Sequence, residues 1–206
     1  MTHAGLVLQI IFSAALVNNV VLGYFLGLCP FFGVSRKISS ALALGAAVTS
    51  VMFFTTLICA AINAVVIGPL NLGYLRLLVF IPVIAAVVYA LELVLRRGTR
   101  PMVENIGAYV PVVGLNCATV GVALILTGEN PIVGRVYSVA ESAIASVATG
   151  VGFALVVLLM AGIRERLEFA QVPRALQGLP IALISAGLMA MAFYGFGAFN
   201  FMSGLK

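Results

Sequence analysis

The chain has 206 residues, of which 63% are hydrophobic and only 8% are charged, and its formal net charge is +5. An average soluble domain carries roughly 25% charged residues, so this composition excludes a water-soluble protein and predicts an all-α integral membrane protein. The connections between apolar segments are too short for a soluble domain. No glycine-rich nucleotide motif is present, so a nucleotide or flavin would have to bind another subunit.

Long charge-free intervals predict the membrane helices in chain order. A helix needs about 20 apolar residues to cross roughly 30 Å of hydrocarbon. The third interval reaches that length only if Glu92 and the stretch to Leu95 are included. Six transmembrane helices are therefore expected, within 1–35, 38–75, 77–91, 105–128, 142–163 and 175–205.

Basic residues in the connections predict the orientation, because Lys and Arg in short loops resist translocation. The connections after the first, third and fifth helices carry Arg36, Lys37, Arg96, Arg97, Arg100, Arg164, Arg166 and Arg174. The opposite side has only Arg76, Arg135 and Lys206. Both termini should face outward. The positive charge is thus interpreted as an orientation signal in contact with anionic lipid, and no nucleic-acid partner is expected.

A short pattern, Cys-x3-Gly-Val, occurs once in each half of the chain, at 29–34 and 117–122. Each half holds three predicted helices, so a duplicated unit would insert its two copies in opposite directions. The predicted inverted repeats are residues 1–100 and 101–206 of a single membrane domain, 1–206. Because functional sites of such repeats gather near the bilayer midplane, Cys29 and Cys117 should approach each other from opposed helices.

The helices that carry these cysteines, the first and the fourth, are rich in residues that weaken a helix. These residues are Gly23, Gly27, Pro30 and Gly33 in the first, and Gly107, Pro111, Gly114 and Gly121 in the fourth. Proline removes a backbone donor and clashes with the preceding turn, so both helices are expected to break or kink there. The alternative is that small residues only permit close helix packing.

Two thiolates are too few for a zinc site or an iron–sulfur cluster, each of which usually needs four protein ligands. A disulfide between Cys29 and Cys117 is one possibility, and a cluster shared with a second, similar subunit is the other. Cys59 has no counterpart in the second half. It is expected to be a small, buried apolar residue.

Five polar residues lie inside or close to the spans. They are Asn18, Asn19, Asn63, Asn116 and Thr119. All of them are suited to hydrogen bonds between helices. Asn18, Asn19 and Asn116 flank the cysteine segments, so they are the ones predicted to lie around the cysteine site or on the ion path.

The charged and titratable residues near the spans have structural interpretations. Glu92 lies four residues before Arg96, a spacing typical of an ion pair on a helix surface. Glu104 and Glu141 lie near predicted helix starts, where a carboxylate interacts favourably with the helix dipole. The single histidine, His3, lies in a terminal tail and is expected to have no role.

Motifs along almost the whole chain resemble those of the A subunit of the Rnf ion-translocating electron-transport complex. They are LVNNVVL at 16–22, FLGLCPF at 25–31, GVS at 33–35, NCA at 116–118, GVA at 121–123, RER at 164–166, VP at 172–173 and ISAGLM at 184–189. The E subunit of Rnf and the D and E subunits of the sodium-translocating NADH:quinone reductase are related. The outward N-terminus and the Leu-Val-Asn-Asn motif favour Rnf A over Rnf E, and Pro30 favours Rnf over the quinone reductase.

The resemblance implies a six-helix subunit that pairs with its inverted homologue, the E subunit, each giving two cysteines to a [2Fe–2S] cluster in the membrane. In this sequence those positions are Cys29 and Cys117. The implied complex, with further subunits B, C, D and G, moves electrons between ferredoxin and NAD, coupled to Na⁺ or H⁺ transport. It lies in the bacterial inner membrane, with both termini of this chain on the periplasmic side. Flavins and NAD are expected only on other subunits.

The local chemistry agrees with that implied role. Thiolates are strongly disfavoured in hydrocarbon unless they are compensated, and ligation to iron provides compensation. This chain would relay electrons as part of a translocase and would hold no complete active site. The alternatives are an inverted-repeat transporter of a small solute or ion without a redox centre, and a subunit that serves assembly only.

Overall fold

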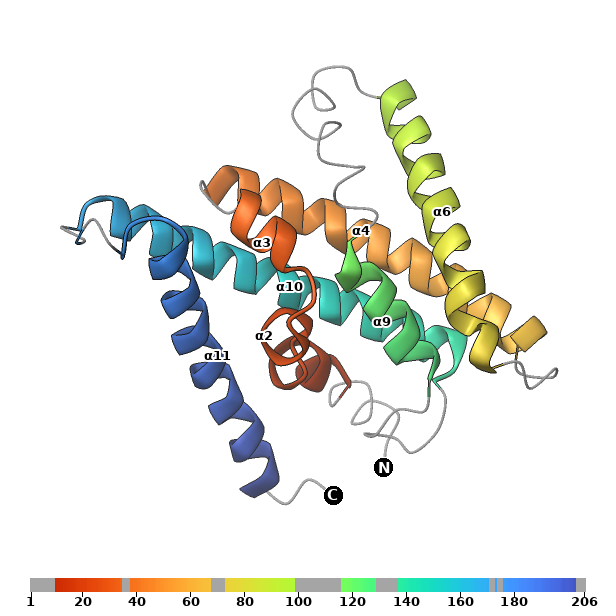
Figure 1. The fold of residues 1–206 in the computed structure, drawn as a ribbon. Helices are drawn as coiled ribbons and strands as arrows, with labels where there is room; N and C mark the ends of the chain where they lie inside the picture. Colours follow the sequence, from red (N-terminus) through yellow and green to blue (C-terminus); the bar gives the residue numbers. More distant parts are fainter. Residues whose placement is uncertain are drawn as a thin grey trace.

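The computed structural model describes residues 10–34, 38–67, 73–98, 116–128, 137–170, 173 and 176–202, and all of their regular elements are helices. Figure 1 shows their arrangement. In chain order they are η1 (Ser13–Val17), α2 (Val20–Tyr24), α3 (Leu28–Val34), α4 (Ile38–Ile62), η2 (Asn63–Ile67), η3 (Gly73–Leu75), α6 (Arg76–Gly98), α9 (Cys117–Thr127), α10 (Val139–Glu168) and α11 (Leu179–Met202). The expected all-helical class is confirmed for this part of the chain.

Two helices are long and apolar enough to cross a bilayer, Ile38–Val65 with 28 residues and Val139–Glu168 with 30. Shorter apolar helical stretches follow the other expected spans, at Arg76–Ala90, Cys117–Thr127 and Leu179–Gly195. Each of these helices begins or ends within a few residues of the interval predicted from charge. By length and composition, at least two helices of this chain are therefore able to span a membrane.

The first expected span is not one continuous helix. It consists of η1, α2 and α3, which are separated at Asn18–Asn19 and again at Phe25–Gly27. Phe25 and Gly27 both adopt left-handed backbone conformations, with φ of 55° and 83°, which a continuing right-handed helix does not permit. The predicted break near Cys29 is confirmed. In the fourth span α9 begins at Cys117, while Gly107, Pro111 and Gly114 lie outside the described residues.

Helices α4 and α10 cross antiparallel at the centre of the molecule (Figure 1). Gly45 of α4 faces Ala154 of α10, and Gly150 of α10 faces Thr49 of α4. Each of the two helices thus contributes one glycine to the crossing. A second pair of contacts is also reciprocal, since α9 of the second half packs against α4 and η1 of the first half packs against α10. On the outside α6 lies against α4, and α11 contacts α10 and the broken first helix.

Apolar residues fill the interior and also cover much of the outside. The largest fully buried side chains include Phe31, Phe80 and Phe153. Large apolar side chains such as Leu78 and Leu188 are exposed, and helices α4, α9, α10 and α11 have no distinct polar face. Helices that are apolar all round are typical of a membrane environment, in which lipid covers the outer side chains.

The close crossing predicts a stability difference between two glycines of α10. A Cβ added at Gly150 would lie 2.6 Å from Thr49 Cγ2 and 2.9 Å from Thr49 Cα, whereas a Cβ at Gly162 would meet nothing within 4 Å. Gly150→Ala should lower the free energy of unfolding by about 1–3 kcal/mol because the crossing is overpacked. The matched control Gly162→Ala should be neutral or gain up to about 1 kcal/mol of helix propensity. Thermal unfolding in detergent measures both, and equal melting temperatures would contradict the crossing.

Candidate functional site

Cys29 and Cys117 occupy similar places in two short helices. Cys29 is the second residue of α3 and Cys117 is the first residue of α9. Both are free thiols with exposed side chains. Each thiol therefore lies at the start of a helix, where a ligand or a neighbouring protein can reach it.

A backbone hydrogen bond joins the two cysteine segments. The N–H of Gly27, two residues before Cys29, donates to Cys117 Sγ at 3.0 Å. Gly27 has φ +83°, and a Cβ there would lie 2.9 Å from the Phe153 ring and 3.1 Å from Ala118 Cβ. Only glycine combines this left-handed turn with such close packing, so Gly27 allows the loop before α3 to reach the sulfur of α9.

Asn19 stabilises the break in the first helix through hydrogen bonds of its side chain. Its Oδ1 accepts hydrogen bonds from the N–H groups of Val21 at 3.0 Å and Leu22 at 3.5 Å, which caps α2. Its Nδ2 donates to the carbonyl oxygens of Ala15 at 3.1 Å and Gly152 at 3.0 Å. The side chain is only 2% exposed. One buried amide thus ties η1, α2 and α10 together, and a place for Asn19 around the cysteine site or on an ion path stays a prediction.

Asn116 caps α9 in a similar way but leaves one donor unused. Its Oδ1 accepts from the N–H of Ala118 at 3.3 Å and lies 3.5 Å from Cys117 Sγ, whose thiol donates to it. Its Nδ2 is buried and has no acceptor within the described protein, although the residue is only 4% exposed. A buried donor without a partner is costly. This one lies beside the cysteine site and near Gly27.

Asn18, the third predicted asparagine, has a different setting. Its Nδ2 donates to Ser13 Oγ at 3.1 Å, and it lines a cavity of about 50 Å³ together with Tyr24, Tyr137 and Thr149. That volume accommodates one or two water molecules. A place for Asn18 on an ion path stays a prediction.

Several polar groups of η2, α4, α9 and α10 are buried. Asn63 Nδ2 donates to the carbonyl of Thr127 at 3.3 Å, an interhelical bond of the kind expected. Four hydroxyls are buried without an acceptor or donor among the described residues, those of Thr55 and Thr56 in α4, Thr119 in α9 and Ser142 in α10. Other buried hydroxyls, such as that of Thr149, donate to a carbonyl of their own helix.

The remaining candidate residues have structural positions or lie outside the described residues. Cys59 is buried, as expected. Glu141 lies in the first turn of α10, as predicted, and its Oε2 accepts the N–H of Ser138 at 2.9 Å. The side chains of Glu92 and Arg96, and all of Glu104 and His3, lie outside the described residues. In the described part of the chain, no group of three or more His, Cys, Asp or Glu residues is placed to hold a metal ion.

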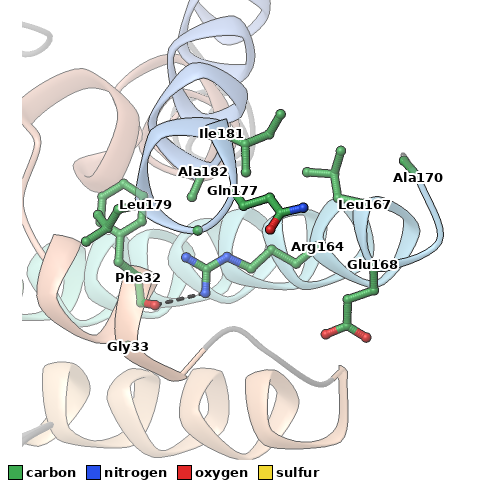
Figure 2. Close-up of a pocket in the computed structure, with 11 residues that line it drawn as sticks. Phe32, Gly33, Arg164, Leu167, Glu168, Ala170, Gln177, Leu179, Ile181 and Ala182 are labelled. Atoms are coloured by element: carbon green, nitrogen blue, oxygen red, sulfur yellow. Dashed lines mark hydrogen bonds between the residues drawn. The ribbon is translucent and has the colours of Figure 1, made fainter. Parts of the chain in front are cut away.

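A larger cavity, of about 690 Å³, opens beside α3 at the end of α10. Figure 2 shows Arg164 of α10 reaching across it to the end of α3, below the start of α11. Arg164 Nη1 donates to the carbonyl of Phe32 at 2.9 Å. The sequence singled out Arg164 as an orientation signal and as part of the RER motif, and neither interpretation predicted its contact with the cysteine-bearing helix.

Comparison with known proteins decides the family. Residues 7–200 match the family model described as "Rnf-Nqr subunit, membrane protein". The chain belongs to the Rnf-Nqr family. The broken first helix and the paired cysteine segments are thus features of an Rnf-Nqr membrane protein.

Three curated relatives of this Rnf-Nqr chain are named as A subunits. The A subunit of the Na(+)-translocating ferredoxin:NAD(+) oxidoreductase complex of Acetobacterium woodii is 44% identical over 187 residues, covering 91% of this chain and 94% of the relative. The A subunits of the ion-translocating oxidoreductase complexes of Sodalis glossinidius and Rhodobacter capsulatus are 45% and 44% identical over 189 residues, covering 92% of this chain and 95% of each relative. The resemblance to Rnf A seen in the sequence is confirmed.

The two adjacent asparagines predict unequal effects on stability. Asn19→Ala removes a helix cap and two donated hydrogen bonds, and should cost about 2–4 kcal/mol of unfolding free energy. Asn18→Ala removes only one partly buried hydrogen bond to Ser13, and should cost about 1 kcal/mol or less. Denaturant titration of the two purified variants compares them. Similar losses would show that Asn19 does not hold the break.

Gly27 and Gly33 provide a second matched pair, at the two ends of α3. Gly27→Ala forces a side chain into a left-handed turn against the ring of Phe153, so it should lower stability by about 1–3 kcal/mol. A Cβ at Gly33 meets nothing within 4 Å, so Gly33→Ala should be neutral or slightly stabilising. Thermal unfolding of both variants tests this, and an unchanged Gly27→Ala protein would refute the close approach at Cys117.

Proposed function

We propose that this chain is the A-type membrane component of an ion-translocating oxidoreductase complex and carries electrons through a [2Fe–2S] cluster that it shares with a homologous E subunit. The observation that carries the proposal is the 3.0 Å hydrogen bond from Gly27 N–H to Cys117 Sγ, which joins the segments of the two cysteines. The names of the relatives support the class of complex, since they describe ion-translocating oxidoreductases.

The surroundings of the cysteines fit two ligands of such a cluster. Both thiols are exposed and free, so neither is committed to a disulfide or to core packing. The N–H of Gly27 already donates to the Cys117 sulfur, and the Nδ2 of Asn116 is a second, unused donor nearby. Hydrogen bonds to ligating sulfurs stabilise their negative charge and help to set the potential. A bound cluster would supply one-electron transfer, and the chain would supply thiolates, donors and an apolar shell.

Ligand number supports a shared site. A [2Fe–2S] cluster takes four protein ligands, and this chain offers two exposed thiols, while Cys59 is buried. The missing ligands would come from the E subunit, which would present the same two positions in the opposite orientation. Subunits B, C, D and G would complete the complex and hold the flavins and NAD. Exposure of both thiols in the isolated chain is expected if a partner covers them in the assembly.

Reciprocal packing supports the inverted repeat of residues 1–100 and 101–206. The contact of Gly45 with Ala154 has a counterpart in the contact of Gly150 with Thr49. Likewise α4 of the first half packs against α9 of the second, and α10 of the second half packs against η1 of the first. Six spanning helices with both termini on the periplasmic side of the inner membrane follow from this repeat together with the basic connections.

In the proposed complex, electron transfer is coupled to ion movement. The relative from Acetobacterium woodii is named as Na⁺-translocating, and either Na⁺ or H⁺ suits the present chain. The buried hydroxyls of Thr55, Thr56 and Thr119 lack protein partners among the described residues. Hydroxyl oxygens without partners suit waters or a small cation, so these residues are the first to test for an effect on transport.

Electron paramagnetic resonance tests the proposal directly. The complex is purified with wild-type chain, with Cys29→Ser, with Cys117→Ser and with the matched control Cys59→Ala, before and after dithionite reduction. We expect a [2Fe–2S] signal in wild type and control, and loss or strong alteration of it in the two other variants. A wild-type complex without a cluster signal from this pair of homologues, or a signal unchanged by both variants, would overturn the proposal. Solute uptake by the isolated chain in liposomes would support the transporter alternative.

A further inference from the structure

Arg164 contacts the helix that carries Cys29 in two ways. Its Nη1 donates to the carbonyl of Phe32 at 2.9 Å, and its guanidinium carbon lies 5.9 Å from the centre of the Phe32 ring. Figure 2 shows the side chain extending from α10 to the end of α3. Phe32 is three residues after Cys29, so the two residues lie about one turn apart on the same short helix.

The hydrogen bond from Arg164 satisfies a backbone carbonyl that has no partner within α3. This helix has only seven residues, Leu28–Val34, and the last four carbonyls of any helix have no partner within it. In an apolar environment each unsatisfied carbonyl costs several kcal/mol. The carbonyl of Phe32 is one of these four, and Arg164 satisfies it with a charged donor. A cation is also favourable at the C-terminal end of a helix.

The cavity of about 690 Å³ explains how a cation is accommodated there. Arg164, Glu168 and Gln177 contribute polar groups to its lining, and Leu179 and Ile181 contribute an apolar wall. Figure 2 shows the Glu168 side chain pointing away from the guanidinium. Water in this cavity would hydrate Arg164, which lowers the cost of keeping a full charge beside α3.

We propose that Arg164 is a positioning residue for Cys29 and that its charge raises the reduction potential of the cluster. This inference rests on the proposed function. The hydrogen bond and the ring contact fix the far end of α3, and with it the direction in which Cys29 points. Because a cation favours the more negative, reduced state of a nearby redox centre, loss of the charge should shift the potential to more negative values.

Hydrogen–deuterium exchange of the purified chain tests the positioning without any cofactor. In Arg164→Gln the amides of residues 31–34 should exchange roughly tenfold faster, as expected from the loss of a hydrogen bond to a charged group. Arg166→Gln is the matched control, since Arg166 is an exposed base on the same helix turn, and it should leave exchange in α3 unchanged. Equal protection of α3 in wild type and Arg164→Gln would overturn the positioning role.

Redox titration of the cluster signal in the purified complex tests the effect of charge. Arg164→Gln should shift the midpoint potential to a more negative value. Arg164→Lys keeps the charge and should have a midpoint potential close to that of wild type, and Arg166→Gln should shift it much less than Arg164→Gln. A midpoint unchanged in Arg164→Gln would refute the electrostatic role. If wild type has no cluster signal, the proposed function fails, while the exchange experiment still decides whether Arg164 holds α3. If Arg164→Gln does not assemble, Arg164→Lys replaces it in both experiments. We then expect faster amide exchange of α3 and a midpoint potential close to that of wild type.

Discussion

A helix that breaks inside a membrane must satisfy its freed backbone groups without bulk water, and Asn19 meets much of that requirement in this chain. Its amide caps α2 and also bonds to the carbonyls of Ala15 and Gly152. Because unsatisfied backbone groups are so costly in hydrocarbon, the hydrogen bonds of Asn19 stabilise the break at Asn18–Asn19. The position of the following turn, and hence of Cys29, depends on this arrangement.

The hydrogen bond from Asn19 to the carbonyl of Gly152 requires a close approach to the backbone of α10, which glycine residues permit. A Cβ at Gly152 would collide with the backbone of Ala15, and a Cβ at Gly150 would collide with Thr49 of α4. Two neighbouring glycines on α10 therefore admit the broken helix on one side and α4 on the other. Small residues serve as contact points between membrane helices because they allow backbones to approach closely.

The two cysteines occupy similar places but have different neighbours. Cys117 receives a hydrogen bond from the backbone of Gly27 and lies beside the unused donor of Asn116. Cys29 has a more distant neighbour, Arg164, which acts at the other end of its helix. In the proposed shared cluster, the negative charge on the two sulfurs would thus be balanced by a neutral backbone donor on one side and a full positive charge on the other.

The sequence alone determined the helical membrane class, most helix positions, the break beside Cys29 and the family, because hydrophobic length, Gly and Pro placement and short motifs are local properties. It also singled out Cys29, Cys117 and the three asparagines. Their partners could not be predicted, since the contacts of Asn19 with Gly152, Gly27 with Cys117 and Arg164 with Phe32 join residues far apart in the chain. Such contacts follow from how α10 crosses its neighbours, and that crossing is set by side-chain shape across several helices at once, so only the tertiary structure decided them.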